Sequence, residues 1–485
     1  MIDGELVLAI DAGSGGARAT LYDAGGERVS RAERAWHATV PPELAPFGRE
    51  YAPAELANAL DEATLEALAA VDPASVVGVA CTGQRIACAL LDAAGATLYA
   101  GPNGDVRALA GAALEDLDDD ALYARTGRFP PWIYAPARAR WFEANAPELH
   151  GRIRHVVGLP GWAAHRLTGE VAVDATVAAD LMMLDVASGR RALVAGCLPD
   201  EAWPRLAAPT DRLGGVSDAA AARLGLRPGV PVAVGCADTQ AALRLGGADT
   251  LVAGSSAPLL RRVDGPRPDP ARRLWLDPTL DGFCLEANLG EMGTAHRWLE
   301  ELLALPSFEA FDALARGAAV GARGASAHLG PRAMDLRALS TGRPAGLLLP
   351  FGETSLSAPP GRAEIARSFL ESCAFATRAG RAWLDAVAPA PDALHLVGGL
   401  AQSALLGDVL ASVLGVPVRR GPHDATARGA AACAMVVAGL ASDLDDAVAR
   451  LEREPAVHLP DEELEDAYDD AYERWLEREQ QLEEM

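Results

Sequence analysis

The chain has 485 residues, half of them hydrophobic, and a formal net charge of −24. This length exceeds what one hydrophobic core usually supports and predicts two domains, while the acidic balance argues against a protein that binds nucleic acid. All 43 residues of the Lys+Arg class are arginine. The missing lysine excludes Walker-A ATPases, protein kinases and pyridoxal-phosphate enzymes, because each of these needs one.

Cysteine usage and apolar runs indicate the compartment. The seven cysteines are scattered and form no C-x-x-C pair, which is typical of a reducing compartment. The chain starts without the basic segment of a signal peptide, and its longest late apolar run is too short to span a bilayer. The nine histidines show no metal-ligand spacing, so we expect no zinc. We therefore expect a cytoplasmic protein that does not bind membranes.

The first polar loop joins two apolar, strand-like runs at residues 6–10 and 19–23. Its glycines around Ser14 are similar to the nucleophile elbow of hydrolases, but that elbow requires a helix directly after the serine. The run that follows Ser14 is a poor helix former, which argues against a hydrolase. A phosphate-binding loop and a simple glycine turn remain as interpretations of this loop.

A similar pattern returns at residues 76–98 and 249–265. The later copy places Gly254 and Ser255 where the first loop has Gly13 and Ser14. A spacing of about 240 residues predicts two related domains, each opening with a small-residue loop between paired strands. Two such loops facing each other would offer N–H groups to a polyphosphate. The alternative for either loop alone is an ordinary glycine-rich hairpin.

Two later strands end in residues of interest. The run 230–235 predicts a buried strand that delivers Asp238 at its C-terminal end, where open sheets place catalytic groups; the alternative is that Asp238 only caps the next helix. After a long predicted helix at 361–387, the strand 394–399 ends in two glycines, and a helix follows near Ser403. Paired glycines would let a flat adenine or ribose lie against the backbone.

The last 25 residues contain twelve acidic residues and two arginines. Their apolar positions recur at helical spacing: Leu464, Tyr468, Tyr472 and Trp475. This spacing predicts an amphipathic helix that packs on the protein with its acidic face in water. We therefore divide the chain into a first domain at 1–246, a second at 247–445 and an acidic helical tail at 446–485.

Taken in order, these features resemble the FGGY carbohydrate kinase family of the actin-like, hexokinase-like and Hsp70-like ATPase superfamily. The motifs that carry the resemblance run from residue 6 to about 440: Asp11-x-Gly13-Ser14 with Arg18, Gln84 after a strand, Asp105 with Arg107, "LTGE" at 167–170, Asp238 with the small residues after it, Gly398–Gly399, and "ARGAA" at 427–431. The resemblance implies an α/β fold of two ribonuclease-H-like domains with a nucleotide cleft between them.

The resemblance also implies roles for single residues. Asp238 would be the catalytic base that takes the proton of a sugar hydroxyl, and Asp11 would organise Mg²⁺ through water. The phosphates of ATP would contact Gly13, Ser14, Arg18, Gly254 and Ser255, and the adenosine would contact Gly398, Gly399 and Ser403. The substrate contacts would be Gln84, Arg85, Asp105, Tyr134, Asp238 and Thr239. Arg85 could instead be a surface charge or pair with a local carboxylate, and Tyr134 could be a core aromatic.

Departures from the family patterns bear on the substrate. Glycerol kinases share Arg85 but carry a glutamate where this chain has Ile86, which argues against glycerol. The Met-His of typical xylulokinases is missing after Gln84, and Asn103 replaces the usual tryptophan, as in kinases of the autoinducer type. The segment 351–370 is shorter than in typical members.

The resemblance thus implies an ATP-dependent kinase of a xylulose- or ribulose-type ketose or of an autoinducer-type linear hydroxyketone. The alternative is a sensor or interaction protein that binds ATP and sugar with little transfer. A homodimer is the base-rate expectation for the assembly.

Overall fold

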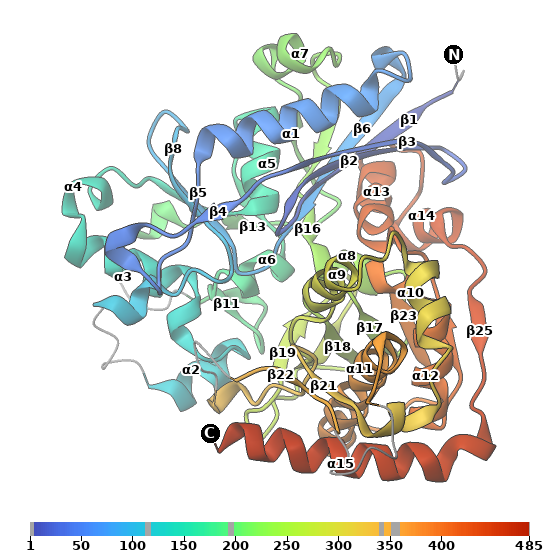
Figure 1. The fold of residues 1–485 in the computed structure, drawn as a ribbon. Helices are drawn as coiled ribbons and strands as arrows, with labels where there is room; N and C mark the ends of the chain where they lie inside the picture. The colour runs from blue at the N-terminus through green and yellow to red at the C-terminus, as the bar shows by residue number, and fades with distance from the viewer. Residues whose placement is uncertain (1–3, 112–117, 193–197, 339–343, 351–358, 485) are drawn as a thin grey trace. The chain divides into compact units, whose positions relative to one another are not determined.

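The computed structural model describes residues 4–111, 118–192, 198–338, 344–350 and 359–484. They form two compact units, drawn as ribbons in Figure 1. The first unit comprises Met1–Leu245, Leu276–Phe283 and Ala425–Glu452, and the second comprises Gly246–Trp275, Cys284–Asp424 and Arg453–Met485. The first unit therefore takes up two segments from later in the chain. The domain boundaries expected at 246 and 445 stay a prediction.

The main sheet of the first unit has the strand order β14-β15-β6-β1-β2-β3, with β16 beside β6. Strands β1, β2 and β3 form an antiparallel meander, and β6 joins β1 in parallel. Their bounds are Leu6–Ala12 (β1), Gly16–Asp23 (β2), Arg28–Ala35 (β3), Val76–Gly83 (β6), Arg212–Gly215 (β14), Pro231–Ala233 (β15) and Cys236–Ala237 (β16).

Helices cover both faces of this sheet. Every residue of β1 is buried, and its even-numbered residues share a core with apolar residues of α1 and α5. Helix α13 packs on β1 and β6, and a Cβ on Gly78 would lie 2.6 Å from the carbonyl oxygen of Ala434. Glycine at position 78 therefore permits close packing of α13. The helices are α1 (Pro53–Leu68), α5 (Leu159–Thr168), α7 (Asp218–Leu224), α8 (Asp238–Leu243), α13 (Ala425–Val437) and α14 (Leu444–Leu451).

A smaller sheet of the first unit has the order β8-β7-β9. The strand, loop, strand and turn predicted at 76–98 are confirmed as β6, β7 and the turn before β8. Unlike the strands of the first hairpin, however, β6 and β7 lie in different sheets, because β7 pairs with β8 and β9. The other elements are β4 (Ala38–Thr39), β5 (Glu50–Tyr51), β7 (Cys88–Leu91), β8 (Thr97–Gly101), β9 (His155–Gly158), β10 (Ala172–Val173), β11 (Leu184–Asp185), β12 (Arg190–Arg191), β13 (Arg205–Leu206), α2 (Asp119–Thr126), α3 (Ala135–Asn145), α4 (Pro147–His150) and α6 (Ala175–Asp180).

The main sheet of the second unit has the order β19-β20-β18-β17-β23-β24-β25. Strands β17 and β18 form an antiparallel hairpin, and β23 joins β17 in parallel, which repeats the pairing of β1, β2 and β6. The bounds are Asp249–Val252 (β17), Pro258–Val263 (β18), Trp275–Pro278 (β19), Phe283–Asn288 (β20), Leu394–Val397 (β23), Val418–Arg420 (β24) and Ala456–His458 (β25).

The tail forms helix α15 (Glu465–Glu483), which packs within the second unit as the apolar spacing predicts. Tyr468 and Trp475 are buried, and Trp475 Nε1 donates to Ser372 Oγ of α11 at 3.1 Å. Tyr472 is half-buried, and Leu464 precedes the helix. The other elements of this unit are α9 (Met292–Leu302), α10 (Phe308–Ala315), α11 (Arg362–Asp385), α12 (Ala404–Leu414), β21 (Ser326–His328) and β22 (Gly346–Leu348).

Three expectations from the sequence concern absences or lie partly outside the described residues. No helix in the described ranges combines the length and the apolar character needed to cross a membrane. The six described cysteines are free and buried, and Cys197 lies outside the described residues. Residues 351–358 of the shortened segment 351–370 lie outside the described residues.

Candidate active site

Three candidate side chains lie at one edge of the main sheet in the first unit. Strands β1, β6 and β16 are parallel neighbours, so their carboxyl ends meet at this edge. Asp11 lies next to the end of β1, Gln84 directly follows β6, and Asp238 directly follows β16. Open α/β sheets bind ligands outside the carboxyl ends of their strands. The fold therefore brings these three side chains to the edge where a ligand is expected.

Asp11 is a buried carboxylate with one oxygen engaged. It lies opposite Arg18 in the β1–β2 ladder, and Arg18 Nη1 donates to Asp11 Oδ2 at 3.0 Å. The other oxygen, Oδ1, is buried and has no hydrogen-bond partner among the residues that the structure describes. Burial raises the pKa of Asp11, and the nearby Arg18 charge opposes that rise. A bound cation would satisfy the second oxygen.

The loop between β1 and β2 holds its carbonyl groups by contacts with two aromatic residues. Trp36 Nε1 donates to the carbonyl oxygen of Gly13 at 3.1 Å, and the Tyr51 hydroxyl donates to that of Ser14 at 3.1 Å. The Trp36 amide donates to the carbonyl oxygen of Gly15 at 3.3 Å. Ser14 and Gly15 are exposed. Because all three acceptors are already bonded, an approaching phosphate would meet less carbonyl repulsion at this loop.

Asp238 is the first residue of α8 and is half-buried. Its Oδ1 accepts a hydrogen bond from the Thr239 amide at 2.8 Å. Burial raises the pKa of Asp238 to about 7; the Asp11 charge adds to the rise, and Arg85 and the Thr239 amide oppose it. A carboxylate whose pKa lies near neutrality is suited to general-base work.

Gln84 is buried between two polar partners. Its Oε1 lies 3.1 Å from the Tyr51 hydroxyl, whose single proton is shared between this oxygen and the carbonyl oxygen of Ser14. Its Nε2 donates to Asn103 Oδ1 at 2.8 Å. Tyr51 therefore connects the loop between β1 and β2, through Ser14, with the predicted acceptor contact at Gln84. Sequence patterns gave no signal for this function of Tyr51, because it comes from a separate short strand, β5.

Arg85 takes part in a buried group of charges that no sequence pattern indicates. Arg85 Nη1 lies 3.6 Å from Asp277 Oδ2, and Arg128 Nη2 lies 2.6 Å from Asp277 Oδ1. Arg128 Nη2 also lies 2.8 Å from Asp180 Oδ1. The hydroxyl of Tyr134 is buried and has no hydrogen-bond partner among the described residues. Arg85 therefore pairs with a local carboxylate, which is one of the interpretations that the sequence left open. Tyr134 is buried, and its hydroxyl group needs a hydrogen-bond partner.

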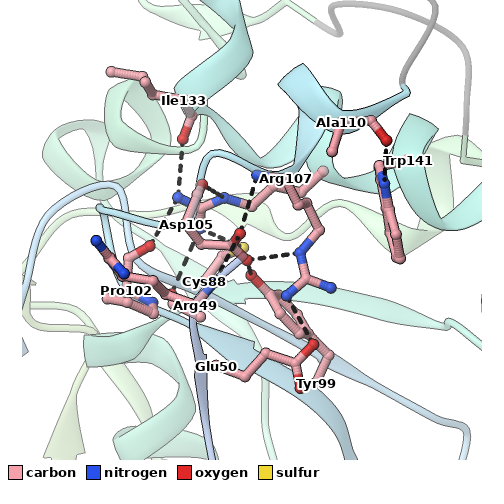
Figure 2. Close-up of polar contacts among 12 residues, drawn as sticks. Arg49, Glu50, Cys88, Tyr99, Pro102, Asp105, Arg107, Ala110, Ile133 and Trp141 are labelled. Atoms are coloured by element: carbon pink, nitrogen blue, oxygen red, sulfur yellow. Dashed lines mark hydrogen bonds and ion pairs between the residues drawn. The ribbon is translucent and has the colours of Figure 1, made fainter. Parts of the chain in front are cut away.

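Asp105 is the centre of a network in the first unit that Figure 2 shows. It has no exposed surface, and its oxygens accept from Arg107 Nε at 2.8 Å, from the amides of Arg107 and Arg49 at 3.1 and 3.3 Å, and from the Tyr99 hydroxyl. These donors explain its burial as a carboxylate. Asp105 therefore positions the turn that carries Asn103, and direct contact with a substrate stays a prediction from the resemblance.

The loop between β17 and β18 in the second unit holds its carbonyl groups by backbone amides. The carbonyl oxygens of Ala253, Gly254 and Ser255 accept from the amides of Leu400, Gly293 and Thr294 at 3.0, 2.9 and 3.4 Å. As in the first unit, three successive carbonyl groups of the loop are bonded. Gly254 and Ser255, predicted to contact phosphate, lie in this loop.

The paired glycines and Ser403 lie beside this second loop. Gly398 has a φ of 93°, and a Cβ there would lie 2.9 Å from the carbonyl oxygen of Ala253, so glycine is required. Gly399 begins the short 3-10 turn that follows. Ser403 is fully buried; its hydroxyl donates to Asp312 Oδ1 at 2.6 Å and accepts from the Leu406 amide at 3.0 Å. These contacts make Ser403 the N-cap of α12, and its contact with adenosine stays a prediction.

The residues present fit a magnesium ion bound together with phosphates. Within the described ranges, no group of three or more His, Cys, Asp or Glu side chains could hold a metal ion. In nucleotide sites, however, Mg²⁺ is held by one or two carboxylates, waters and the phosphates themselves. Asp11, with its unsatisfied Oδ1, meets that requirement.

Comparisons with known proteins agree over almost the whole chain. The profile of the "FGGY family of carbohydrate kinases, N-terminal domain" matches residues 6–245, and that of the C-terminal domain matches residues 312–438. An autoinducer-2 kinase from Enterobacter sp. (strain 638) is 27% identical over 507 residues, covering 97% of this chain and 93% of that protein.

Solved structures show the same fold. A xylulose kinase from Rhodospirillum rubrum is 28% identical with a TM-score of 0.79 and covers 99% of both chains. A ligand-bound xylulose kinase from Lactobacillus acidophilus has a TM-score of 0.82 at 19% identity, covering 99% of this chain and 98% of that one. These matches confirm the predicted α/β, actin-like fold class.

Proposed function

The chain belongs to the FGGY family of carbohydrate kinases, and we propose that it transfers the γ-phosphoryl group of ATP to one hydroxyl of a small ketose or linear hydroxyketone. The observation that supports this most is the position of Asp238. Its pKa of about 7 and its place at the same sheet edge as Asp11 and Gln84 suit a base beside a bound alcohol.

Asp238 would accept the proton of the acceptor hydroxyl as that oxygen forms its bond to the γ-phosphorus. The bond between the γ-phosphorus and the oxygen bridging to the β-phosphate then breaks, and ADP leaves with that oxygen. The Thr239 amide holds Oδ1 of Asp238 and so orients the carboxylate. A base with this pKa is largely ionised slightly above neutral pH while it is still basic enough to take a proton.

ATP and Mg²⁺ are the cofactors expected for this family. When bound, Mg²⁺ would neutralise phosphate charge, and Asp11 would hold it, through water, with the oxygen left unsatisfied in the protein. Arg18 is fixed by Asp11 at 3.0 Å and would bring the positive charge that lysine supplies in other kinases. The exposed backbone at Ser14 and Gly15 would face the phosphates.

The acceptor is proposed from the relatives and from the site. Relatives at 27% and 28% identity are named for autoinducer-2 and for xylulose, so both a linear hydroxyketone and a pentulose are candidates. Gln84, Arg85 and Tyr134 would provide the polar contacts to the acceptor. The cytoplasmic location and the homodimer expected from the sequence stay predictions.

Substitution Asp238→Asn tests the mechanism. It keeps the shape of the side chain and its bond to the Thr239 amide, so we expect binding of ATP to persist while acceptor-dependent ADP release falls about 10³-fold or more. Asp218→Asn is the matched control, because Asp218 is also the first residue of a short helix of the first unit but is exposed. ADP release by Asp238→Asn at the wild-type rate would contradict the proposed role.

A panel of acceptors tests the reaction itself. D-xylulose, D-ribulose, glycerol and a linear hydroxyketone would be compared by ADP release at saturating ATP. Binding of ATP and sugars without acceptor-dependent ADP release would instead favour the sensor that the sequence left as the alternative.

A further inference from the structure

We propose that Asp277, together with Asp180, makes the acceptor site selective for uncharged polyhydroxylated acceptors and against sugar acids. The inference rests on the proposed function, because it takes the region beside Asp238 as the place where the acceptor binds. It assigns a charge-compensating, positioning role to two carboxylates that would not touch the reacting atoms.

Both arginines of this region are already neutralised by carboxylates of the protein. Asp277 lies 3.6 Å from Arg85 and 2.6 Å from Arg128, and Asp180 lies 2.8 Å from Arg128. All four residues are at most 8% exposed. Charges at such distances in a buried site interact strongly with each other, so the guanidinium groups present little positive potential to a carboxylate of a substrate.

A close backbone approach puts Asp277 beside Arg128. Gly127 ends α2 with a φ of 67°, and its carbonyl oxygen accepts from the Leu276 amide at 3.1 Å. A Cβ on Gly127 would lie 2.4 Å from the carbonyl oxygen of Leu276, so only glycine allows this approach. Arg128 and Asp277 are the next residues along the two segments, and the contact between the segments places their side chains together.

The charge group borders the proposed base. Arg85 directly follows Gln84 at the sheet edge, and the charges of Arg85 and Asp180 both act on Asp238. Residues Ile86 and Met182, which follow Arg85 and Asp180 closely in the chain, have φ angles of 65° and 55°. A positive φ angle is unfavourable for residues with bulky side chains such as isoleucine. Residues with such strained backbone are concentrated at functional sites.

Tyr134 provides an independent sign that a ligand binds here. Its side chain is fully buried, and its hydroxyl has no hydrogen-bond partner among the described residues. Burial raises the pKa of Tyr134, and the charges of Arg128, Asp277, Asp180 and Arg85 act on it as well, so its hydroxyl lies near the same group. A buried hydroxyl without a partner is costly. A hydroxyl or carbonyl oxygen of an uncharged acceptor would supply that partner.

The net charge of this group of side chains distinguishes sugar acids from uncharged acceptors. With Asp238 ionised, three carboxylates stand against two guanidinium groups, so the site carries an excess of negative charge. A sugar acid would bring a further carboxylate next to like charges, which is unfavourable. A ketose or polyol of the same length meets no such penalty.

Matched acceptors test the proposal on the wild-type protein. We expect kcat/KM for D-xylulose and xylitol to exceed that for xylonate by at least 100-fold, and the same order for sorbitol over gluconate. Calorimetric binding of the same compounds without ATP gives a second readout that does not depend on transfer. Equal or tighter binding of the sugar acid, or binding of neither class, would overturn the inference.

Variants then assign the effect to Asp277. In Asp277→Asn, the ratio of kcat/KM for the uncharged acceptor to kcat/KM for the sugar acid should fall at least 10-fold, chiefly because KM for the sugar acid falls. Asp277→Glu should keep the wild-type ratio. Adding Arg85→Gln to Asp277→Asn should restore the discrimination. If Asp277→Asn fails to fold, Asp180→Asn should narrow the ratio in the same direction. An unchanged ratio in the folded variants contradicts the proposal.

Failure of the inference can be told apart from failure of the proposed function. A protein that phosphorylates sugar acids as readily as ketoses remains a carbohydrate kinase but disproves the role of Asp277. A protein that binds uncharged sugars selectively but releases no ADP with any acceptor keeps the selectivity and disproves the transfer.

Discussion

The loops after β1 and after β17 solve one structural problem with different groups. Each loop joins two antiparallel strands, and each has three successive carbonyl oxygens held by donors from its own unit. In the first loop, side chains of Trp36 and Tyr51 provide two of the three donors. In the second loop, all three donors are backbone amides.

This difference teaches where each loop is sensitive. A loop held by side chains can be loosened by a substitution that removes one polar atom. A loop held by backbone amides tolerates changes of the donor side chains, but it does not tolerate a change that moves the donor backbone. The two loops therefore predict opposite responses to conservative and to backbone-disturbing substitutions.

Among substitutions at the two loops, the largest effect is expected from Gly293→Ala in the second unit. A Cβ at this position would lie 2.3 Å from the carbonyl oxygen of Gly254, so α9 or the loop must move. We expect the free energy of unfolding to fall by about 1–3 kcal/mol and KM for ATP to rise at least tenfold. Chemical denaturation and ATP-dependent kinetics measure the two effects.

Thr294→Ala is the matched control for that substitution. Thr294 is exposed and donates to the loop only through its backbone amide, which alanine keeps. We expect wild-type stability and kinetics. A loss of ATP affinity in Thr294→Ala as large as in Gly293→Ala would show that the second loop depends on side chains after all.

We expect kcat/KM to depend on pH, about tenfold per pH unit, because of Asp238 in the first unit. Burial, with a further contribution from the Asp11 charge, raises the pKa of Asp238 to about 7. Because a general base works only when ionised, kcat/KM for the acceptor should fall about tenfold for each pH unit below 7. A profile that stays flat between pH 6 and pH 8 would contradict the assignment of Asp238 as base.

The same raised pKa predicts that the stability of the protein changes with pH in the opposite direction to its activity. The folded protein keeps the proton of Asp238 to a higher pH than the unfolded chain, so its stability falls as pH rises from about 4 to about 7. Asp238→Asn should remove this part of the pH dependence. Thermal unfolding of both proteins across that range provides the measurement, and identical slopes would contradict the raised pKa.

Tyr51→Phe should raise KM for ATP less than Gly293→Ala does. It removes the hydroxyl that is shared between the Ser14 carbonyl oxygen and Oε1 of the buried Gln84. We expect unfolding to become easier by about 1–3 kcal/mol, with several-fold higher KM values for ATP and for the acceptor. Tyr472→Phe in the second unit serves as the control and should be close to neutral. Unchanged KM values in Tyr51→Phe would show that the bonds of Tyr51 do not shape either site.

Sequence patterns were sufficient for the elements that periodicity and small residues define. The two hairpins, the strand end that precedes Asp238, the long helix that became α11 and the packed tail helix all have local signals. The fold class followed from motifs that keep their order along the chain. These features depend on near neighbours, and near neighbours are what a single sequence displays.

The rest depends on contacts between distant segments. Asp277 meets Arg128 only because Gly127 lets two segments approach closely, and no local pattern marks that approach. The two strands expected within 76–98 are present, but no local pattern shows that the chain turns at Ile86, with a φ of 65°, into another sheet. The family resemblance implies a substrate contact for Asp105, but no local pattern shows that the donors to its carboxylate come from separate parts of the first unit.

The smallest effect is expected from Gly15→Ala, which tests whether a ligand lies against the first loop without changing how firmly the loop is held. A Cβ on Gly15 would have no atom within 4 Å, so Gly15→Ala should leave stability unchanged. If phosphate lies against this exposed backbone, the added methyl group should raise KM for ATP by about threefold to tenfold, because it takes the place of the ligand. Gly265→Ala, equally open in the second unit, is the control and should change neither quantity. A normal KM for ATP in Gly15→Ala would place the phosphates away from the first loop and leave its bonded carbonyl groups as a purely structural feature.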